Sequence, residues 1–135
     1  MKELIELIKQ ARFVYVCGNG GSAATAEHFT NDLFSKGIKA ICLNSNTSIM
    51  TMIANDFGYQ FIFSKQLEVY ANKKDLLITI SCSGTSNNIV YAKWEAQRKG
   101  MEIYSFKTFD SEEPRDYGKL EDEYIQLVHR IKNAL

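Results

Sequence analysis

Short apolar runs alternate with helix-compatible segments along most of this chain. The runs occupy residues 13–17, 39–43, 76–80 and 101–106, and each is followed by a stretch that suits a helix or by a polar turn that leads to one. Strands that alternate with helices are typical of a parallel sheet covered on both faces. The sequence therefore predicts a doubly wound, Rossmann-type three-layer α/β/α fold with four clear strands.

Helices are expected at residues 1–12, 22–36, 48–55, 61–72, 86–99 and 120–135. Residues 107–119 are polar and contain the single proline, so no strand is expected there. The length of 135 residues suits one domain, and neither a linker nor a repeat interrupts the pattern. We therefore expect a single domain over residues 1–135.

Composition excludes several classes of partner. The 16 Lys and Arg residues balance 16 Asp and Glu residues, so neither nucleic acid nor an anionic membrane is an expected partner. No apolar run approaches the roughly 20 residues that span a bilayer, and residues 1–12 lack the pattern of a signal peptide. Cys17, Cys42 and Cys82 form no CxxC pair, which favours free thiols in the cytoplasm.

Two turns rich in Gly, Ser and Thr follow the first and third predicted strands, at residues 18–22 and 81–86. Ligands of open α/β sheets bind at this carboxyl edge, and helix N-termini there attract anions. Gly20 and Gly21 let the backbone approach a ligand, and Ser22 adds a hydroxyl. Such a turn can simply cap a helix with serine. Two of them at matching positions favour a phosphate site.

The second turn places four hydroxyls around Gly84, from Ser81, Ser83, Thr85 and Ser86. Hydroxyls and amides without Lys or Arg suit a phosphate monoester on a neutral molecule. The first turn also matches the dinucleotide pattern G-x-G-x-x-A, but that pattern requires an acid after the second strand, where Asn44 stands. No nucleotide cofactor is therefore expected.

The chain has only two histidines, and each has a carboxylate partner at helical spacing. His28 and Asp32 lie four residues apart on one face of a predicted helix. Glu121 and His129 lie eight residues apart, or about two turns, on one side of the last predicted helix. Such groups can move protons. The alternative is that they are solvated surface groups.

Several motifs resemble the SIS (sugar isomerase) domain family, and within it the bacterial phosphoheptose isomerases. They are residues 18–23 with 26–29, residues 55–58 with 62–67, and residues 81–88. The resemblance covers residues 13–106 well. It implies interconversion of an aldose and a ketose phosphate through an enediol, with sedoheptulose 7-phosphate as the ketose.

The resemblance also implies roles for particular residues. Asp32 and His129 are the expected catalytic residues, and His28, Asp32, Glu121 and His129 match positions that bind zinc in some members. Asp32 and Glu121 stand where the family has Glu and Gln, and Asp is one methylene shorter. The expected substrate-binding residues are Asn19, Gly20, Gly21, Ser22, Lys36, Asn55, Asp56, Ser81, Cys82, Ser83, Thr85 and Ser86.

The family has a longer N-terminal helical region and a fifth strand, so we expect a homodimer or homotetramer to cover the exposed apolar faces, with sites near subunit interfaces. Some relatives are not enzymes. A non-catalytic sugar-phosphate-binding or adaptor module, like the DnaA initiator-associating protein, is the alternative, and a dinucleotide-binding subunit is a third. The two substitutions favour the module, and the retention of both histidines favours the enzyme.

Overall fold

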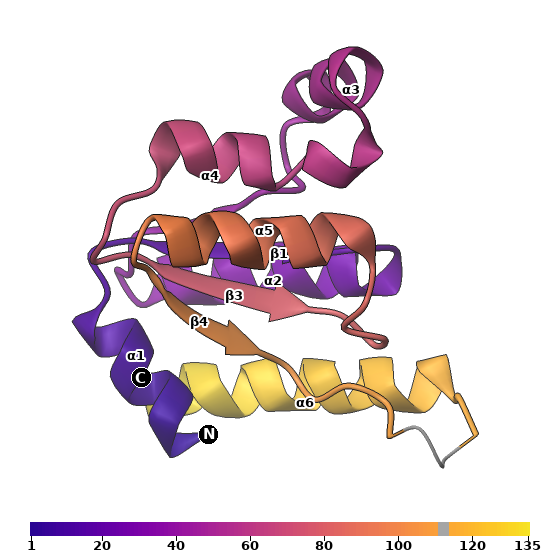
Figure 1. Ribbon diagram of the computed structural model, residues 1–135. Helices are drawn as coiled ribbons and strands as arrows, with labels where there is room; N and C mark the ends of the chain where they lie inside the picture. Colours follow the sequence, from indigo (N-terminus) through magenta and orange to yellow (C-terminus); the bar gives the residue numbers. More distant parts are fainter. Residues whose placement is uncertain (111–113) are drawn as a thin grey trace.

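The computed structural model describes residues 1–110 and 114–135. A parallel sheet of four strands in the order β2-β1-β3-β4 lies between two helical layers (Figure 1). This confirms the predicted α/β fold. Its elements are α1 (Lys2–Gln10), β1 (Val14–Gly18), α2 (Gly21–Ser35), β2 (Ala40–Cys42), α3 (Thr47–Asp56), the 3₁₀ turn η1 (Tyr59–Phe61), α4 (Ser64–Tyr70), β3 (Leu76–Ile80), α5 (Asn87–Arg98), β4 (Glu102–Ser105) and α6 (Tyr117–Ala134).

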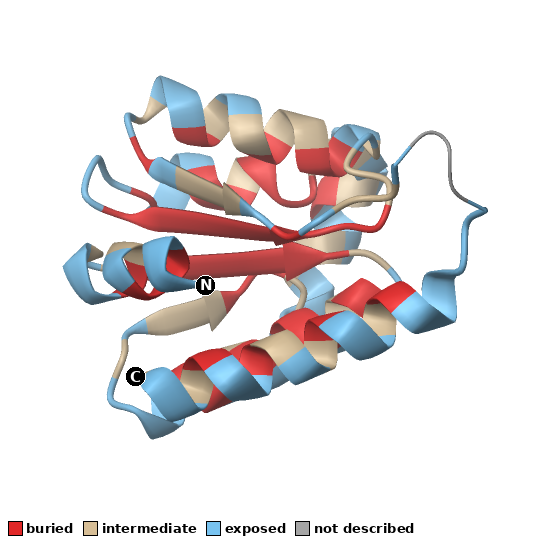
Figure 2. Ribbon diagram, turned by 90° about the horizontal axis from the view of Figure 1, so that it is seen from below, coloured by how far each residue is buried: buried red, intermediate tan, exposed pale blue. Residues whose placement is uncertain are grey.

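Each face of the sheet has its own hydrophobic core. On one face, Val16 and Ile78 pack with apolar side chains of α1, α2 and α6. On the other, Tyr15 and Leu77 pack with side chains of η1 and α3 to α5. β1 and β3 are buried along their whole length, and Figure 2 shows them in red between the helices. This explains why both strands are mostly apolar, since nearly all of their side chains meet one core or the other.

The observed element ends differ from the expected ones by a few residues, for local reasons. The last helix begins at Tyr117 rather than at residue 120, because the Asp116 side chain accepts a hydrogen bond of 3.0 Å from the Lys119 amide and caps it. The expected helix at 61–72 is observed as η1 and the shorter α4. No strand occurs in residues 107–110 or 114–116, while residues 111–113 of the predicted polar stretch lie outside the described part.

Within the described residues, no helix combines the length and apolarity that crossing a membrane requires.

Tyr124 joins α6 to the turn after β3. Its side chain is buried, and its hydroxyl lies 3.2 Å from the Ser81 carbonyl oxygen and also contacts the Lys107 carbonyl oxygen. Burial raises the pKa of this phenol, which keeps it protonated as a donor. The contact fixes the start of the second predicted phosphate turn against α6.

Replacing Tyr124 with Phe should therefore destabilise the fold. The substitution preserves packing but leaves buried carbonyl groups without their donor, which costs about 1–2 kcal/mol. Urea denaturation measures the loss. Tyr104→Phe is the control, because the Tyr104 hydroxyl makes no hydrogen bond within the described residues. Equal stability of both variants would show that the Tyr124 hydroxyl does not hold this turn.

Candidate functional site

The two predicted phosphate turns lie side by side at the carboxyl edge of the sheet. β1 and β3 pair in parallel from Val14 opposite Leu76 to Gly18 opposite Ile80, so both strands end at the same level. The chain also leaves β1 and β3 toward opposite edges of the sheet, which makes this the switch point of the topology. The turns enclose a pocket of about 300 Å³, lined by Asn19, Gly20, Gly21, Ser22, Ser81, Cys82, Ser83, Ser86, Tyr117 and Glu121.

Backbone conformation explains the glycines of these turns. Gly20 and Gly84 adopt positive φ angles of 57° and 68°, which other residues rarely tolerate. A Cβ on Gly18 would lie 2.6 Å from the Ser22 carbonyl oxygen and 2.8 Å from that of Ile80. Because the helices α2 and α5 start directly at the two turns, their N-terminal amides face the pocket and favour an anion.

Asn88 is a site residue for which the sequence predicted no role. It is only 2% exposed, and its amide exchanges two hydrogen bonds of 2.8 Å with the amide of Asn19. This pair ties the start of α5 to the first turn and sets the separation of the two turns. Its position in the sequence, directly after the serine cluster and in the first turn of a helix, could have indicated that it belongs to the site.

Asn44 braces the other side of the first turn. Its amide donates a 2.7 Å hydrogen bond to the Gly18 carbonyl and accepts one of 3.1 Å from the Gly18 amide. The residue that stands where a dinucleotide site needs an acid therefore supports the strand end instead. This is a structural reason against a dinucleotide fingerprint.

Glu121 contributes a negative charge to this pocket. Its carboxylate lies so close to Gly21 that a Cβ there would overlap it, and the pair holds the start of α6 against the start of α2. The N-terminal end of α2 stabilises the carboxylate through its dipole. The same charge repels an incoming phosphate.

A second group of predicted residues converges farther along α2 and α6. The Nε2 atoms of His28 and His129 are 3.0 Å apart, and His28 Nε2 lies 3.5 Å from Asp32 Oδ2. One ligand atom from each residue falls within 4.8 Å of the others. The structure thus brings together three of the four predicted metal ligands. Glu121 is absent from this group because it lies at Gly21, about two turns away.

The donor set of these three residues suits a metal ion. Two imidazole nitrogens point at one another, and the Asp32 Oδ2 atom is buried without a hydrogen-bond partner among the described residues. Two nitrogens and one carboxylate oxygen form a common ligand set for zinc. Lys132, which the sequence analysis did not assign to the site, donates a 2.6 Å hydrogen bond to Asp32 Oδ1.

Four of the predicted substrate-binding residues do not line the pocket between the turns. Lys36 is at the far end of α2 from the pocket, beside a hollow formed with α1. Asn55 and Asp56 are exposed at the end of α3, where the Asn55 amide donates to the Asp56 carboxylate at 3.0 Å. Thr85 belongs to the second turn but does not line the pocket.

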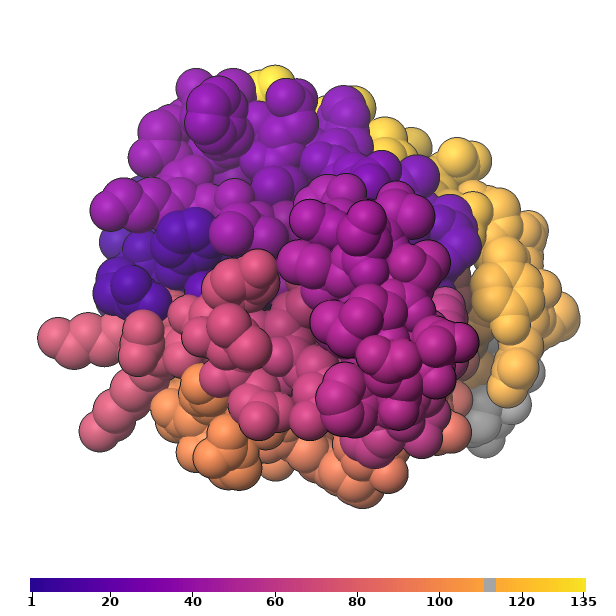
Figure 3. Space-filling view, turned by 90° about the horizontal axis from the view of Figure 1, so that it is seen from above, coloured from indigo at the N-terminus to yellow at the C-terminus, as the bar shows by residue number. Residues whose placement is uncertain are grey.

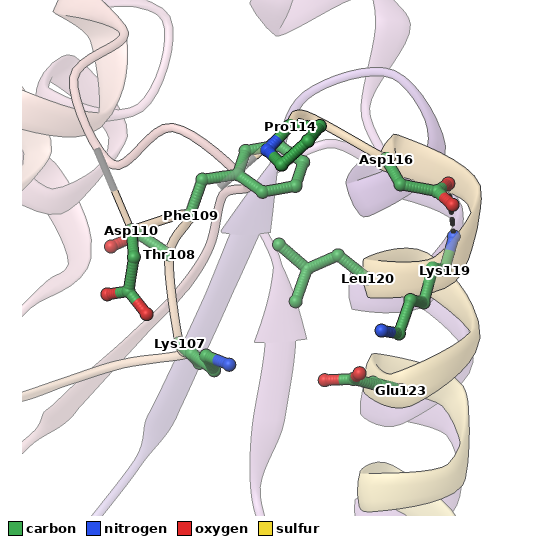
Figure 4. Close-up of a pocket in the computed structure, with 9 residues that line it drawn as sticks. All are labelled: Lys107, Thr108, Phe109, Asp110, Pro114, Asp116, Lys119, Leu120 and Glu123. Atoms are coloured by element: carbon green, nitrogen blue, oxygen red, sulfur yellow. Dashed lines mark hydrogen bonds between the residues drawn. The ribbon is translucent and has the colours of Figure 1, made fainter. Parts of the chain in front are cut away.

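A larger hollow of about 390 Å³ lies between the segment after β4 and the start of α6 (Figure 4). Its lining mixes Lys107 and Lys119 with Asp110 and Glu123. None of the predicted site residues lines it. The predicted site is therefore the smaller pocket between the two turns.

Comparison with known proteins identifies the fold family. The family model described as "SIS domain" matches residues 2–107. This chain belongs to the SIS domain family. The predicted resemblance is thereby confirmed.

Several relatives of the chain are named phosphoheptose isomerase. The chain is 42% identical over 123 residues to the phosphoheptose isomerase of Helicobacter pylori (strain P12), covering 87% of this chain and 61% of that protein. It therefore spans less than two thirds of that relative. Phosphoheptose isomerase GmhA from Neisseria gonorrhoeae superposes with a TM-score of 0.89 at 28% identity, covering 98% of this chain and 80% of that one. The enzyme from Francisella tularensis gives a TM-score of 0.87 at 27% identity, with the same coverage.

The charge of Glu121 leads to a prediction about anion affinity. Glu121→Gln removes the repulsion and keeps the side-chain size, so inorganic phosphate should bind roughly five-fold more tightly at low salt. Calorimetry measures this, and Glu123→Gln is the control because Glu123 lies outside the pocket on the same helix. Unchanged or weaker binding by Glu121→Gln would contradict the placement of phosphate here.

Ser83→Ala should have the opposite effect on the same measurement. Its hydroxyl lines the pocket beside the Thr85 amide, which donates to it at 3.3 Å. Loss of one hydrogen bond to a charged group weakens binding by about 1.5–3 kcal/mol. Affinity equal to that of the unsubstituted protein would remove Ser83 from the phosphate site.

Proposed function

We propose that this chain carries the site of a sugar-phosphate aldose–ketose isomerase that acts on sedoheptulose 7-phosphate. The observation that carries the proposal is the convergence of His28, Asp32 and His129 near a phosphate-sized pocket. The name of the relatives supports it, and so does their similarity in sequence and fold. The phosphate binds between the two turns, where Ser22, Ser81, Ser83 and Ser86 offer hydroxyls.

The separation of the two groups suits a long sugar phosphate. His28 lies seven residues after Gly21 on α2, which corresponds to about 10 Å along the helix. In a heptulose 7-phosphate the reacting C1 and C2 lie at the opposite end of the molecule from the phosphate. Helix α2 therefore holds the phosphate at its start and presents proton-transfer groups two turns later.

Asp32 and His129 move the protons. One group takes a proton from C1 of the ketose to give the enediol, and a proton is then delivered to C2, while the hydroxyl proton passes from O1 to O2. Asp32 is 1% exposed and lies behind His28, whose side chain is 45% exposed. The sugar therefore meets the two imidazoles first, and Asp32 exchanges protons with it through His28, whose Nε2 lies 3.5 Å from Asp32 Oδ2.

Zinc is the metal that this site is proposed to hold. His28, His129 and the free Oδ2 atom of Asp32 would bind it. Glu121, which the resemblance implies as a fourth ligand, lies at Gly21, about two turns away from this group. Bound zinc supplies a Lewis acid that polarises a carbonyl oxygen.

A non-catalytic sugar-phosphate-binding module is the second candidate. Two observations favour it, namely the pairing of Asp32 with Lys132 and the negative charge of Glu121 in the phosphate pocket. Both would slow an isomerase without preventing the binding of a sugar. Turnover separates the two candidates.

The decisive experiment is an isomerisation assay with sedoheptulose 7-phosphate, with and without added zinc. Asp32→Asn should lower kcat about 100-fold or more, because a proton-transfer group is lost. Asp122→Asn, an exposed change on α6, should leave kcat unchanged. Tight sugar-phosphate binding by the unsubstituted protein without turnover would favour the binding module.

A homo-oligomer in the cytoplasm is also proposed. The face formed by α3 to α5, viewed in Figure 3, exposes the apolar side chains of Met52, Phe57, Val69, Tyr70 and Trp94. An apolar hollow of about 350 Å³ lies between α3 and α4. A second copy would cover this surface. The cytoplasmic location is supported by the free thiols of Cys17, Cys42 and Cys82, which form no disulfide among the described residues.

Light scattering at micromolar concentration should therefore show a dimer or tetramer. Val69→Asp should dissociate it, because Val69 is 77% exposed on this face. Phe34→Asp is the matched control, since Phe34 is 76% exposed on α2, which covers the opposite face of the sheet. A monomeric unsubstituted protein, or dissociation by Phe34→Asp alone, would contradict this interface.

A further inference from the structure

The contact between Lys132 and Asp32 differs from an ordinary surface ion pair. Lys132 Nζ lies 2.6 Å from Asp32 Oδ1, and the Asp32 side chain is 1% exposed while that of Lys132 is 35% exposed. Exposed ion pairs contribute little to stability, but a buried carboxylate that loses its counter-charge is costly. Lys132 therefore balances a charge that the fold has placed out of contact with water.

Helix geometry brings this pair into the cluster of histidines. His129 and Lys132 are three residues apart on α6, and His28 and Asp32 are four residues apart on α2, so each pair shares one helix face. His129 meets His28, and Lys132 meets Asp32. The Asp32 carboxylate is thus divided, with Oδ1 on the ammonium group and Oδ2 facing the imidazoles.

We infer that Lys132 is a resident counter-ion of Asp32, which keeps the site assembled without metal and lowers its affinity for a divalent cation. The inference rests on the proposed function, because it concerns the metal site named there. A cation bound by Asp32 Oδ2 and the imidazoles would lie on the other side of the carboxylate from the ammonium group, which is bound to Oδ1. Two like charges at that distance repel one another.

Lys132 also limits how the carboxylate can bind. While Oδ1 accepts the ammonium hydrogen bond, only Oδ2 is free for a metal ion. The partial exposure of Lys132 gives its ammonium group a path to solvent when a cation arrives. Metal binding therefore competes with an internal ion pair. Lys132 is a positioning residue, since it acts through Asp32.

Cobalt titration of Lys132→Met tests this inference. Co²⁺ is followed by its visible absorption, which reports nitrogen and oxygen ligands directly. Lys132→Met should bind Co²⁺ roughly ten-fold more tightly than the unsubstituted protein. Lys132→Arg retains the charge and should restore the original affinity. Arg130→Met is the control for net charge, because Arg130 is exposed and its Nε donates to the Gln126 carbonyl on its own helix.

Thermal unfolding without metal provides a second readout. Lys132→Met should lower the melting temperature by several degrees, since Asp32 loses its counter-charge. The double variant Asp32→Asn with Lys132→Met should recover part of this loss, because the buried negative charge is removed as well. If Lys132→Met alone folds poorly, a higher melting temperature of the double variant would still show that Lys132 balances the charge of Asp32.

Unchanged or weaker Co²⁺ binding by Lys132→Met would overturn the inference, as would failure of both proteins to bind Co²⁺. Isomerase turnover is measured separately on the unsubstituted protein. Absent turnover together with tighter Co²⁺ binding by Lys132→Met would reject the proposed enzyme and support the counter-ion. Turnover together with unchanged Co²⁺ binding by Lys132→Met would support the proposed enzyme and reject the counter-ion role of Lys132.

Discussion

The parallel pairing of β1 with β3 determines where every other part of the site lies. Because Gly18 pairs with Ile80, two strands that are distant in sequence end at the same level of the sheet. The turns that follow must then run side by side, and the helices after them start facing one space. The Asn19–Asn88 pair fixes the width of this space, while Asn44 holds the end of β1. The pocket between the two turns follows from strand register and three amide side chains.

A second constraint is the packing of α6 along α2. Glu121 lies at Gly21, His129 meets His28, and Lys132 meets Asp32, so the two helices run in the same direction with nearly constant offset. Successive turns of α6 therefore contact successive turns of α2. The first level lies at the pocket between the two turns, and the second holds the imidazoles and the buried carboxylate.

Much of this arrangement was predictable from sequence, because it depends on local patterns. The apolar runs predicted the strands to within about a residue, and turn chemistry placed both Ser-rich loops at the carboxyl edge. The spacing of His28 and Asp32 predicted that they share a helix face. The position of Glu121 was not predictable in the same way, since an eight-residue spacing specifies a side of α6 but not which level of α2 each residue meets.

Residues that act only through partners also escape a sequence analysis. Lys132 reads as one more basic residue on an amphipathic helix, and its role depends entirely on the burial of Asp32 on another helix. Asn88 likewise gains its importance from Asn19, which lies 69 residues away. The packing of α6 on α2 also explains how the chain accommodates Asp32 and Glu121, which stand where the resemblance implies Glu and Gln. The Lys132 ammonium group neutralises the charge of the shorter Asp32, and the positive end of the α2 dipole stabilises the charge of Glu121. Each carboxylate is therefore stabilised by a different positive group within the α2–α6 interface.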